Sequence, residues 1–154
     1  MYGVSKITIE EDIMLIAFTE VSCKSSVMAD IFKRFAEDGV VVDMISQAAP
    51  HATTTSFSFT AAYNHFDTVM KTISGMKKQK GNIPPMISSG YTKINLFGEE
   101  MVTTCGVGAK AVAALAEKDI DIALITTSDY DISLLIRSEC ADEGLAALMD
   151  TFKV

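Results

Sequence analysis

Residues that build metal sites and disulfide frameworks are scarce in this chain. Its 154 residues include three cysteines, two histidines and no tryptophan. Cys23, Cys105 and Cys140 lie far apart, so they form neither a CxxC metal pair nor the framework of a disulfide-rich fold. Neither His51 nor His65 has a ligand-type residue four positions further on. We therefore predict no metal site, no cofactor and a reducing, cytoplasmic location.

Basic charge and long apolar runs are scarce as well. The chain has 13 lysines and arginines against 20 acidic residues, which gives a net charge of -7. Nucleic-acid binding depends on basic patches, so we expect no nucleic-acid partner. No segment approaches the roughly 20 apolar residues that a membrane helix needs, and the N-terminus lacks the pattern of a signal peptide. We therefore expect no membrane partner.

The chain does contain enough apolar residues for a core, and it contains an internal repeat. Hydrophobic residues make up 49% of the sequence, and residues 35–37 align with residues 115–117 at an offset of 80. Each half has a strand pattern, a polar loop, a helical stripe, two strand patterns and a second helical stripe. In the first half these cover residues 13–18, 19–26, 27–35, 40–45, 53–60 and 66–73, and in the second half residues 94–97, 98–106, 107–115, 120–126, 132–136 and 145–152.

The strand count indicates that the two halves interlock. The first half has room for a last strand between residues 85 and 91, whereas the second half ends at Val154, directly after its second helix. Residues 4–10 form a surplus strand pattern, and we predict that this strand completes the second unit. The predicted fold class is α+β, with ferredoxin-like βαββαβ units in tandem that associate side by side. Each unit would be a four-stranded antiparallel sheet with two helices on one face. The first unit would span residues 12–89, and the second unit residues 90–154 plus 1–11.

Each unit repeats two polar features that together suit a small zwitterion. The loop before the first helix leaves backbone N–H groups free, and such a helix N-terminus attracts carboxylates. The next strand ends in polar residues, 43–47 in the first unit and 126–129 in the second. These side chains can take an ammonium group, so an amino acid fits the pair of features. The alternative is that the polar residues only cap strands and turns.

No strong catalytic signature accompanies this pattern. Residues 106–110 contain only a fragment of a phosphate-binding loop, and the chain has no GxSxG elbow. Cys23 and Cys105 precede expected helices, where a helix N-terminus can activate a thiol. A small cysteine enzyme therefore stays open as a third reading, but no histidine lies near either cysteine in the sequence. We predict that the chain is not an enzyme. Ser25 or Ser26 is expected to cap the first helix, and Gly39 to end it.

Several segments in the same order resemble the tandem ACT domains of aspartokinase. They are VDMISQ at 42–47, TTTSFSF at 53–59, KINLFGEEM at 93–101, CGVGAK at 105–110, ITTSD at 125–129 and ISLLI at 132–136. The resemblance covers nearly the whole chain and includes the family's crossed arrangement of N-terminal strand and second unit. The lysine-glycine-glycine-serine opening of the aspartokinase catalytic domain has no counterpart. The resemblance therefore implies a non-catalytic regulatory protein.

The resemblance also implies where a ligand binds. In the family, effector amino acids bind between ACT units, at the loop before the first helix and the polar end of the next strand. Lysine or threonine is then the expected ligand, and a homodimer formed through ACT units is the expected assembly. The implied contact residues of the first unit are Ser22, Cys23, Ser25, Ser26, Asp43, Met44, Ile45 and Gln47. Those of the second unit are Met101, Thr103, Gly106, Val107, Thr127, Ser128 and Asp129.

The first unit departs from the family pattern in its loop before the helix. Cys23 replaces an aspartate that commonly engages the effector's amino group, and Ser25-Ser26 replaces Pro-Gly. The second unit keeps Gly106 and its serine–acid pair, so the two sites need not bind the same ligand. The leading hypothesis is an allosteric amino-acid sensor of aspartokinase type. The alternative is a regulatory or assembly subunit that pairs with an amino-acid biosynthetic enzyme without binding a ligand itself.

Overall fold

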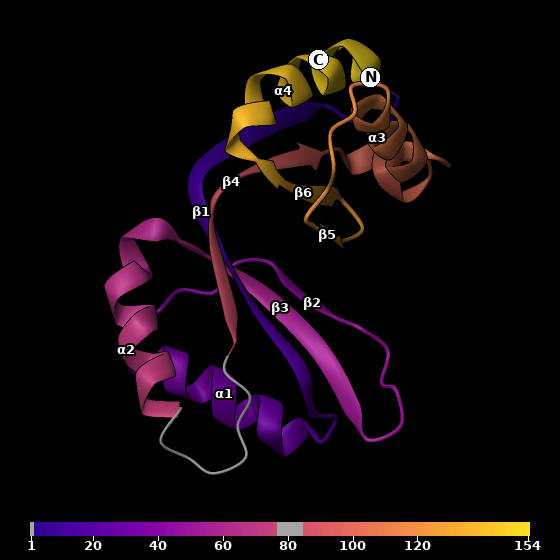
Figure 1. The fold of residues 1–154 in the computed structure, drawn as a ribbon. Coiled ribbons are helices and arrows are strands. Elements are labelled where there is room, and N and C mark those ends of the chain that lie inside the picture. The colour runs from indigo at the N-terminus through magenta and orange to yellow at the C-terminus, as the bar shows by residue number, and fades with distance from the viewer. Residues whose placement is uncertain (1, 77–84) are drawn as a thin grey trace. The chain divides into compact units, whose positions relative to one another are not determined.

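The chain is organised as two compact units. The computed structural model describes residues 2–76 and 85–154. The first unit comprises Ile13–Ser89, and the second comprises the residues up to Asp12 together with Gly90–Val154. Two long strands, β1 (Lys6–Ser22) and β4 (Met86–Phe97), each contribute residues to both units, as Figure 1 shows. The strand order is β2-β3-β1-β4-β6-β5, so each unit has four strands.

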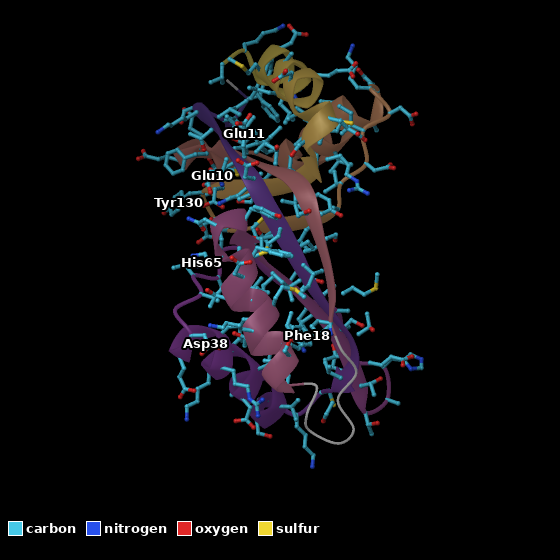
Figure 2. All side chains as sticks on the ribbon, turned by 60° about the vertical axis from the view of Figure 1, so that its left-hand side comes forward. Glu10, Glu11, Phe18, Asp38, His65 and Tyr130 are labelled. Atoms are coloured by element: carbon cyan, nitrogen blue, oxygen red, sulfur yellow. The ribbon has the colours of Figure 1, made fainter. Side chains whose placement is uncertain are left out.

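The first unit packs two helices on one face of its strands. Phe18 on β1, labelled in Figure 2, stacks on Phe57 with 4.9 Å between ring centroids. Phe35 from the first helix meets Phe59 edge to face at 5.0 Å, and both rings are fully buried. These aromatic contacts hold helix and sheet together, because each buried ring removes a large apolar area from water. The elements of this unit besides β1 and β4 are α1 (Ser25–Glu37), β2 (Ile45–Gln47), β3 (Thr54–Ala62), η1 (Tyr63–His65) and α2 (Phe66–Met76).

The second unit repeats this arrangement with aliphatic side chains. Ile94 on β4 and Leu134 on the strand beside it are fully buried, as are Leu115 and Phe152 from the two helices. The alternation of buried and exposed residues along the strands places these side chains on one sheet face, which the helices cover. The elements of this unit besides β1 and β4 are η2 (Glu99–Val102), α3 (Val107–Ala116), β5 (Leu124–Thr127), β6 (Asp131–Arg137), η3 (Ser138–Cys140) and α4 (Ala141–Phe152).

The N-terminal residues lie against β4 within the second unit. The Ser5 backbone N–H donates to the Phe97 carbonyl oxygen at 2.8 Å. Val4 is only 1% exposed and belongs to the core of this unit. All strand pairs whose register is given are antiparallel, and the predicted α+β fold with tandem βαββαβ units is confirmed.

Two predicted strand boundaries are wrong because both long strands continue through polar residues. Residues 4–10 and 13–18 were expected as separate strands, but they form the single strand β1. Likewise, the strand expected between 85 and 91 and the one at 94–97 form β4. The expected polar loop at 19–26 is also too long, because β1 pairs with β3 up to Ser22, past a bulge between Phe18 and Val21.

The strands expected at 40–45 and 120–126 begin later than predicted, for the same reason in both units. The Val40 N–H donates to the Phe35 carbonyl, and the Ile120 N–H donates to the Leu115 carbonyl. Each bond closes the end of a helix rather than pairing a strand. Val40 and Ile120 are buried, so their apolar character reflects packing beside the helix end. The strands themselves are confined to β2 and β5.

The predicted serine cap of α1 is wrong, whereas the predicted end of the helix is confirmed. The N-cap residue is Lys24 and makes no side-chain cap hydrogen bond, so Ser25 and Ser26 are the first residues inside the helix. The C-cap is Asp38, followed by Gly39, whose N–H donates to the Ala36 carbonyl at 3.0 Å. Together with the Val40 bond, this is the hydrogen-bond pattern of a Schellman motif.

Candidate functional site

The loop before α3 and the turn between β5 and β6 are hydrogen-bonded to each other in the second unit. The Gly98 N–H donates to the Tyr130 carbonyl at 2.9 Å. Phe97, the last residue of β4, pairs with Asp131 at the start of β6. Thr127, the last residue of β5, pairs with Ile132, which is the next residue of β6. The loop that follows β4 and the polar end of β5 therefore lie at the same end of the sheet. The structure therefore brings together the two parts of the predicted site in this unit.

The β5–β6 turn uses one of the predicted contact residues for its own structure. The Ser128 Oγ accepts hydrogen bonds from the Tyr130 and Asp131 N–H groups, both at 3.2 Å. The Ser128 N–H in turn donates to the Asp131 carbonyl at 2.9 Å. Ser128 thus holds the turn, while the neighbouring side chains of Thr127 and Asp129 are exposed. Of the three, Asp129 is the carboxylate available to an ammonium group.

The start of α3 presents an open helix N-terminus. Gly106 is its N-cap residue, with a left-handed φ of 81°, and no side-chain cap hydrogen bond is made. Gly106 is exposed, and the first N–H groups of a helix have no partner within the helix. Val107, by contrast, is 4% exposed and packs in the core, and Met101 is half-buried against the same core. The exposed Thr103 hydroxyl donates to the Glu100 carbonyl at 3.2 Å, within the loop. Gly106 and Thr103 are thus accessible to a ligand, and Val107 is not.

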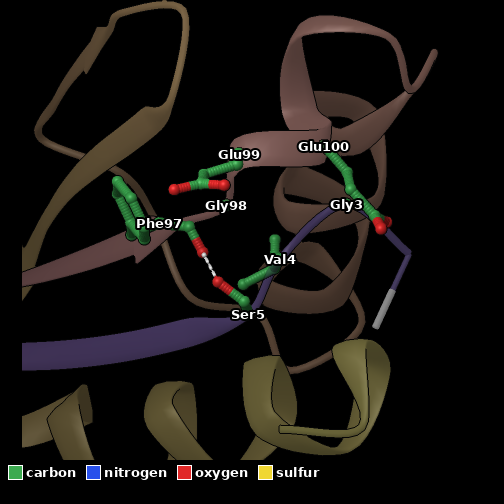
Figure 3. A pocket seen from close by; sticks show the side chains of 7 residues that line it. All are labelled: Gly3, Val4, Ser5, Phe97, Gly98, Glu99 and Glu100. Atoms are coloured by element: carbon green, nitrogen blue, oxygen red, sulfur yellow. Dashed lines mark hydrogen bonds between the residues drawn. The ribbon is translucent and has the colours of Figure 1, made fainter.

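A pocket of about 230 Å³ lies between the first residues of this loop and the N-terminal segment of the chain. Figure 3 shows that it is lined by the N-terminal segment and by the end of β4 with the loop that follows. Sequence reasoning did not find this pocket, although the adjacent acids Glu99 and Glu100 were a visible signal within the loop. Both carboxylates are exposed, so they give this side of the loop a negative charge. The lining residues are Gly3, Val4, Ser5, Phe97, Gly98, Glu99 and Glu100.

The corresponding loop of the first unit is much shorter. Only Cys23 and Lys24 separate β1 from α1. The Cys23 N–H donates to the Thr53 carbonyl at 3.0 Å, and the Lys24 N–H to the Ser22 hydroxyl at 3.3 Å. Ser25 follows directly, and it is exposed at the start of the helix together with Ser26. The backbone ahead of this helix is therefore engaged with its own neighbours.

The polar strand end of the first unit is only partly accessible. Met44 is 3% exposed, and its N–H donates to the Thr60 hydroxyl at 3.0 Å, so this predicted contact residue points away from solvent. Asp43, Ile45 and Gln47 are exposed. Gln47 pairs with Phe57 on β3, whereas Ser22 pairs with Thr54. These rows are three positions apart along β3, which corresponds to about 10 Å. Gln47 therefore lies further from the loop before the helix than Thr127 does in the second unit, although the Cys23–Thr53 bond joins this loop to the residue ahead of β3 as the Gly98–Tyr130 bond does for β6.

Other reactive groups do not cluster at either site in the described residues. Cys23, Cys105 and Cys140 are free thiols. No group of three or more His, Cys, Asp or Glu side chains is placed to hold a metal ion within residues 2–76 and 85–154. The Lys153 ammonium hydrogen-bonds Asp150 and holds the pKa of that carboxyl below its usual value, but this exposed pair lies at the end of α4. Over the same described residues, no helix is long and apolar enough to cross a membrane.

Comparison with known proteins shows which proteins this chain is similar to in sequence and fold. The family model for the ACT domain matches residues 94–152. The aspartate kinase Ask_LysC of Stutzerimonas stutzeri is 29% identical over 115 residues, which are 75% of this chain and 28% of the enzyme. The chain thus spans about 28% of the length of this relative.

Two solved structures match almost the entire chain. The regulatory subunit of aspartate kinase from Thermus thermophilus is 25% identical, with a TM-score of 0.88, and the match covers 97% of this chain and 99% of that chain. A structure of aspartokinase alpha and beta subunits is 27% identical, with a TM-score of 0.88, covering 98% and 99%. Both the fold of each unit and the order of elements agree with the regulatory part of these kinases. Residues 94–152 therefore match the ACT domain, and the chain is similar over almost its whole length to a regulatory subunit of aspartate kinase.

Proposed function

We propose that this chain is a non-catalytic, amino-acid-binding allosteric sensor of aspartokinase type. The observation that carries the proposal is the hydrogen bond from Gly98 to Tyr130, which joins the loop before α3 to the polar β5–β6 turn. An open helix N-terminus and an exposed carboxylate then lie on connected segments of one unit. These are the two charges that an amino acid needs, since helix N-termini attract carboxylates and Asp129 can take the ammonium group.

We propose the second unit as the principal binding site. Its accessible candidate residues are Thr103, Gly106, Thr127 and Asp129, with Ser128 holding the turn between them. The first unit also has exposed candidates, but its Met44 is buried and the backbone ahead of α1 is already hydrogen-bonded. The two ACT units we propose are residues 12–89, and residues 90–154 with 1–11. The cytoplasm is the proposed location.

Ligand binding is tested by measuring thermal stability against the twenty amino acids, with lysine and threonine first. A ligand that binds only the folded chain at 100 times its Kd stabilises it by about 2.7 kcal/mol. We expect at least one amino acid to raise the melting temperature by several degrees. The absence of a shift with every amino acid at millimolar concentration would contradict the sensor proposal.

A second candidate function is suggested by two solved chains that this chain matches over almost their whole length. The match covers 99% of the regulatory subunit of aspartate kinase from Thermus thermophilus and 99% of a chain in the structure of aspartokinase alpha and beta subunits. We propose as the alternative that this chain pairs with an amino-acid biosynthetic enzyme without binding a ligand itself. Co-purification with an aspartokinase catalytic subunit, in the absence of any amino acid that shifts the melting temperature, would favour this alternative.

A further inference from the structure

Gly3 sits in a notch formed by the candidate ligand loop of the second unit. Gly3 is buried, and a Cβ atom there would lie 2.9 Å from Val107 Cγ2 and 3.2 Å from Thr104 Cβ. A Cβ atom at Gly98 would overlap the Gly3 carbonyl oxygen. Gly98, Thr104 and Val107 are the beginning, middle and end of the segment that leads from β4 into α3. The loop therefore encloses the Gly3 backbone.

The two glycines are required for different physical reasons. The φ of Gly98 is -171°, which is extended backbone that any residue adopts, so a larger residue is excluded there by space alone. The φ of Gly3 is +89°, in the left-handed region, so both space and backbone conformation exclude a side chain. The contact between them is backbone against backbone. Neither segment can shift toward the other, and a Cβ atom on either one would force them apart.

The rest of the N-terminal segment, Tyr2–Ser5, is attached to the same parts of the unit. Ser5 bonds to the Phe97 carbonyl through its N–H at 2.8 Å and its hydroxyl at 3.3 Å, as Figure 3 shows for the hydroxyl. Val4 is buried in the core. The Lys110 ammonium on α3 lies 3.8 Å from the Tyr2 ring centroid, a cation–π contact. The segment thus contacts the end of β4, the loop and α3 at once.

We propose that the segment Tyr2–Ser5 and the loop Gly98–Val107 change conformation together. The segment docks fully only when the loop encloses Gly3, and undocking it releases the loop. Gly3 is then a positioning residue for the loop. This part rests on the proposed function: when an amino acid binds at the loop, the same coupling changes the docking of the N-terminal segment. Coupling between two sites is reciprocal, so docking and ligand binding change each other by the same factor.

The coupling is tested first without ligand, by amide hydrogen exchange in the full chain. In Gly3→Ala, the new Cβ meets Val107 and Thr104, and we expect the amides of residues 98–107 to exchange at least tenfold faster. Gly39→Ala is the matched control, because Gly39 has a similar φ of +80° but no atom within 4 Å of its Cβ position. This control introduces similar backbone strain in the first unit. Unchanged exchange in residues 98–107 of Gly3→Ala, relative to Gly39→Ala, would overturn the proposal.

Two further variants keep the test decisive if Gly3→Ala does not fold. Tyr2→Ala removes the contact with Lys110 at an exposed ring, so we expect a fold-preserving, twofold or larger increase of exchange in residues 98–107. Gly98→Ala tests the reverse direction, and there we expect faster exchange of the Ser5 amide. Slower or equal exchange in the partner segment of both variants would reject the coupling.

The response of the N-terminal segment to ligand binding is tested with lysine and threonine as probes. In the wild-type chain, an amino acid that protects residues 98–107 is expected to protect the Ser5 amide as well. Protection of the loop with unchanged exchange at Ser5 would overturn the response of the N-terminal segment. If neither probe nor any other amino acid alters exchange in the loop, the proposed function fails. The ligand-free comparison above still decides the coupling by itself, so the two failures are distinguishable.

Discussion

Ala52 holds a backbone conformation that glycine adopts at lower cost. Reciprocal hydrogen bonds between His51 and Thr54 leave a two-residue loop, and Ala52, its first residue, has a φ of 56°. We expect Ala52→Gly to raise the free energy of unfolding by roughly 0.5–1 kcal/mol, because glycine avoids the left-handed penalty of an L-residue. Chemical denaturation followed by circular dichroism measures this change.

Ala62→Gly is the matched control, since Ala62 has a φ of -64°. There, glycine only adds freedom to the unfolded chain, so the same substitution should lower stability. A loss of stability in both variants would show that the left-handed conformation of Ala52 carries no cost.

Substitution of Asp129 tests whether this carboxylate binds the ammonium group of the amino acid. Asp129→Asn keeps the shape of the β5–β6 turn and removes one negative charge from an exposed position. A hydrogen bond to a charged group contributes about 1.5–3 kcal/mol, so amino-acid affinity should fall roughly tenfold to a hundredfold. Calorimetric titration with the amino acid identified by thermal shift measures this loss. Asp121→Asn, another exposed acid of the second unit, is the control, and an equal loss in both variants would argue for a general charge effect.

At the scale of elements, a side-chain hydrogen bond joins the C-terminal end of α1 to the interior of α2. The Thr72 hydroxyl on α2 is buried and bonds to the carboxylate of Asp38, the C-cap residue of α1. We expect Thr72→Val to lower the free energy of unfolding by about 1 kcal/mol, because the bond is lost while the side-chain volume is kept. Thr68→Val, one turn earlier in α2, leaves the Asp38 bond in place and serves as the control. Equal urea midpoints for Thr72→Val and wild type would contradict this account.

The sequence predicted the order of elements and failed at places where backbone bonding and side-chain burial diverge. Hydrophobic periodicity reports which side chains are buried, and it correctly placed β3, β6 and the four helices. Residues 11 and 12 are acidic and exposed, so they suggested a break, yet the backbone of β1 continues there beside β4. Val40 and Ile120 are buried like strand residues, but their N–H groups close helix ends.

The same limit explains what could not be predicted of the site. The polar loop and strand end of the second unit were visible as residue types, and they lie on connected segments. The notch around Gly3 was not visible, because a contact between two glycine backbones produces no apolar pattern. The role of Ser128 in holding its turn was likewise open, since a serine there suits either a turn or a ligand.

For the molecule as a whole, the two outer strands of the sheet order favour self-association. β2 and β5 end the strand order of the described residues, and each presents an apolar side chain, Ile45 at 50% and Ile125 at 41% exposure. Open strand edges bind other chains, and closed dimers are the commonest assembly. Light scattering should give about twice the 16.6 kDa mass of one chain.

Ile125→Lys tests which edge is used, because lysine on an edge strand opposes pairing. We expect this variant to shift the mass toward the monomer at micromolar concentration. Met149→Lys changes a residue of similar exposure, 42%, on helix α4 rather than on an edge strand, and it should leave the mass unchanged. A monomer in the wild-type chain would contradict the dimer outright.

The sharing of β1 between the units also sets an order of events during synthesis. Residues 13–89 are complete once the ribosome has passed them, whereas the N-terminal residues must wait for residues 90–154 before their own unit can close. At about 5–20 residues per second, that wait lasts on the order of seconds. Val4 and Ile7, which belong to the core of the finished unit, remain without their partners throughout this interval. The N-terminal strand is therefore open to chaperones and to mispairing until the second unit closes.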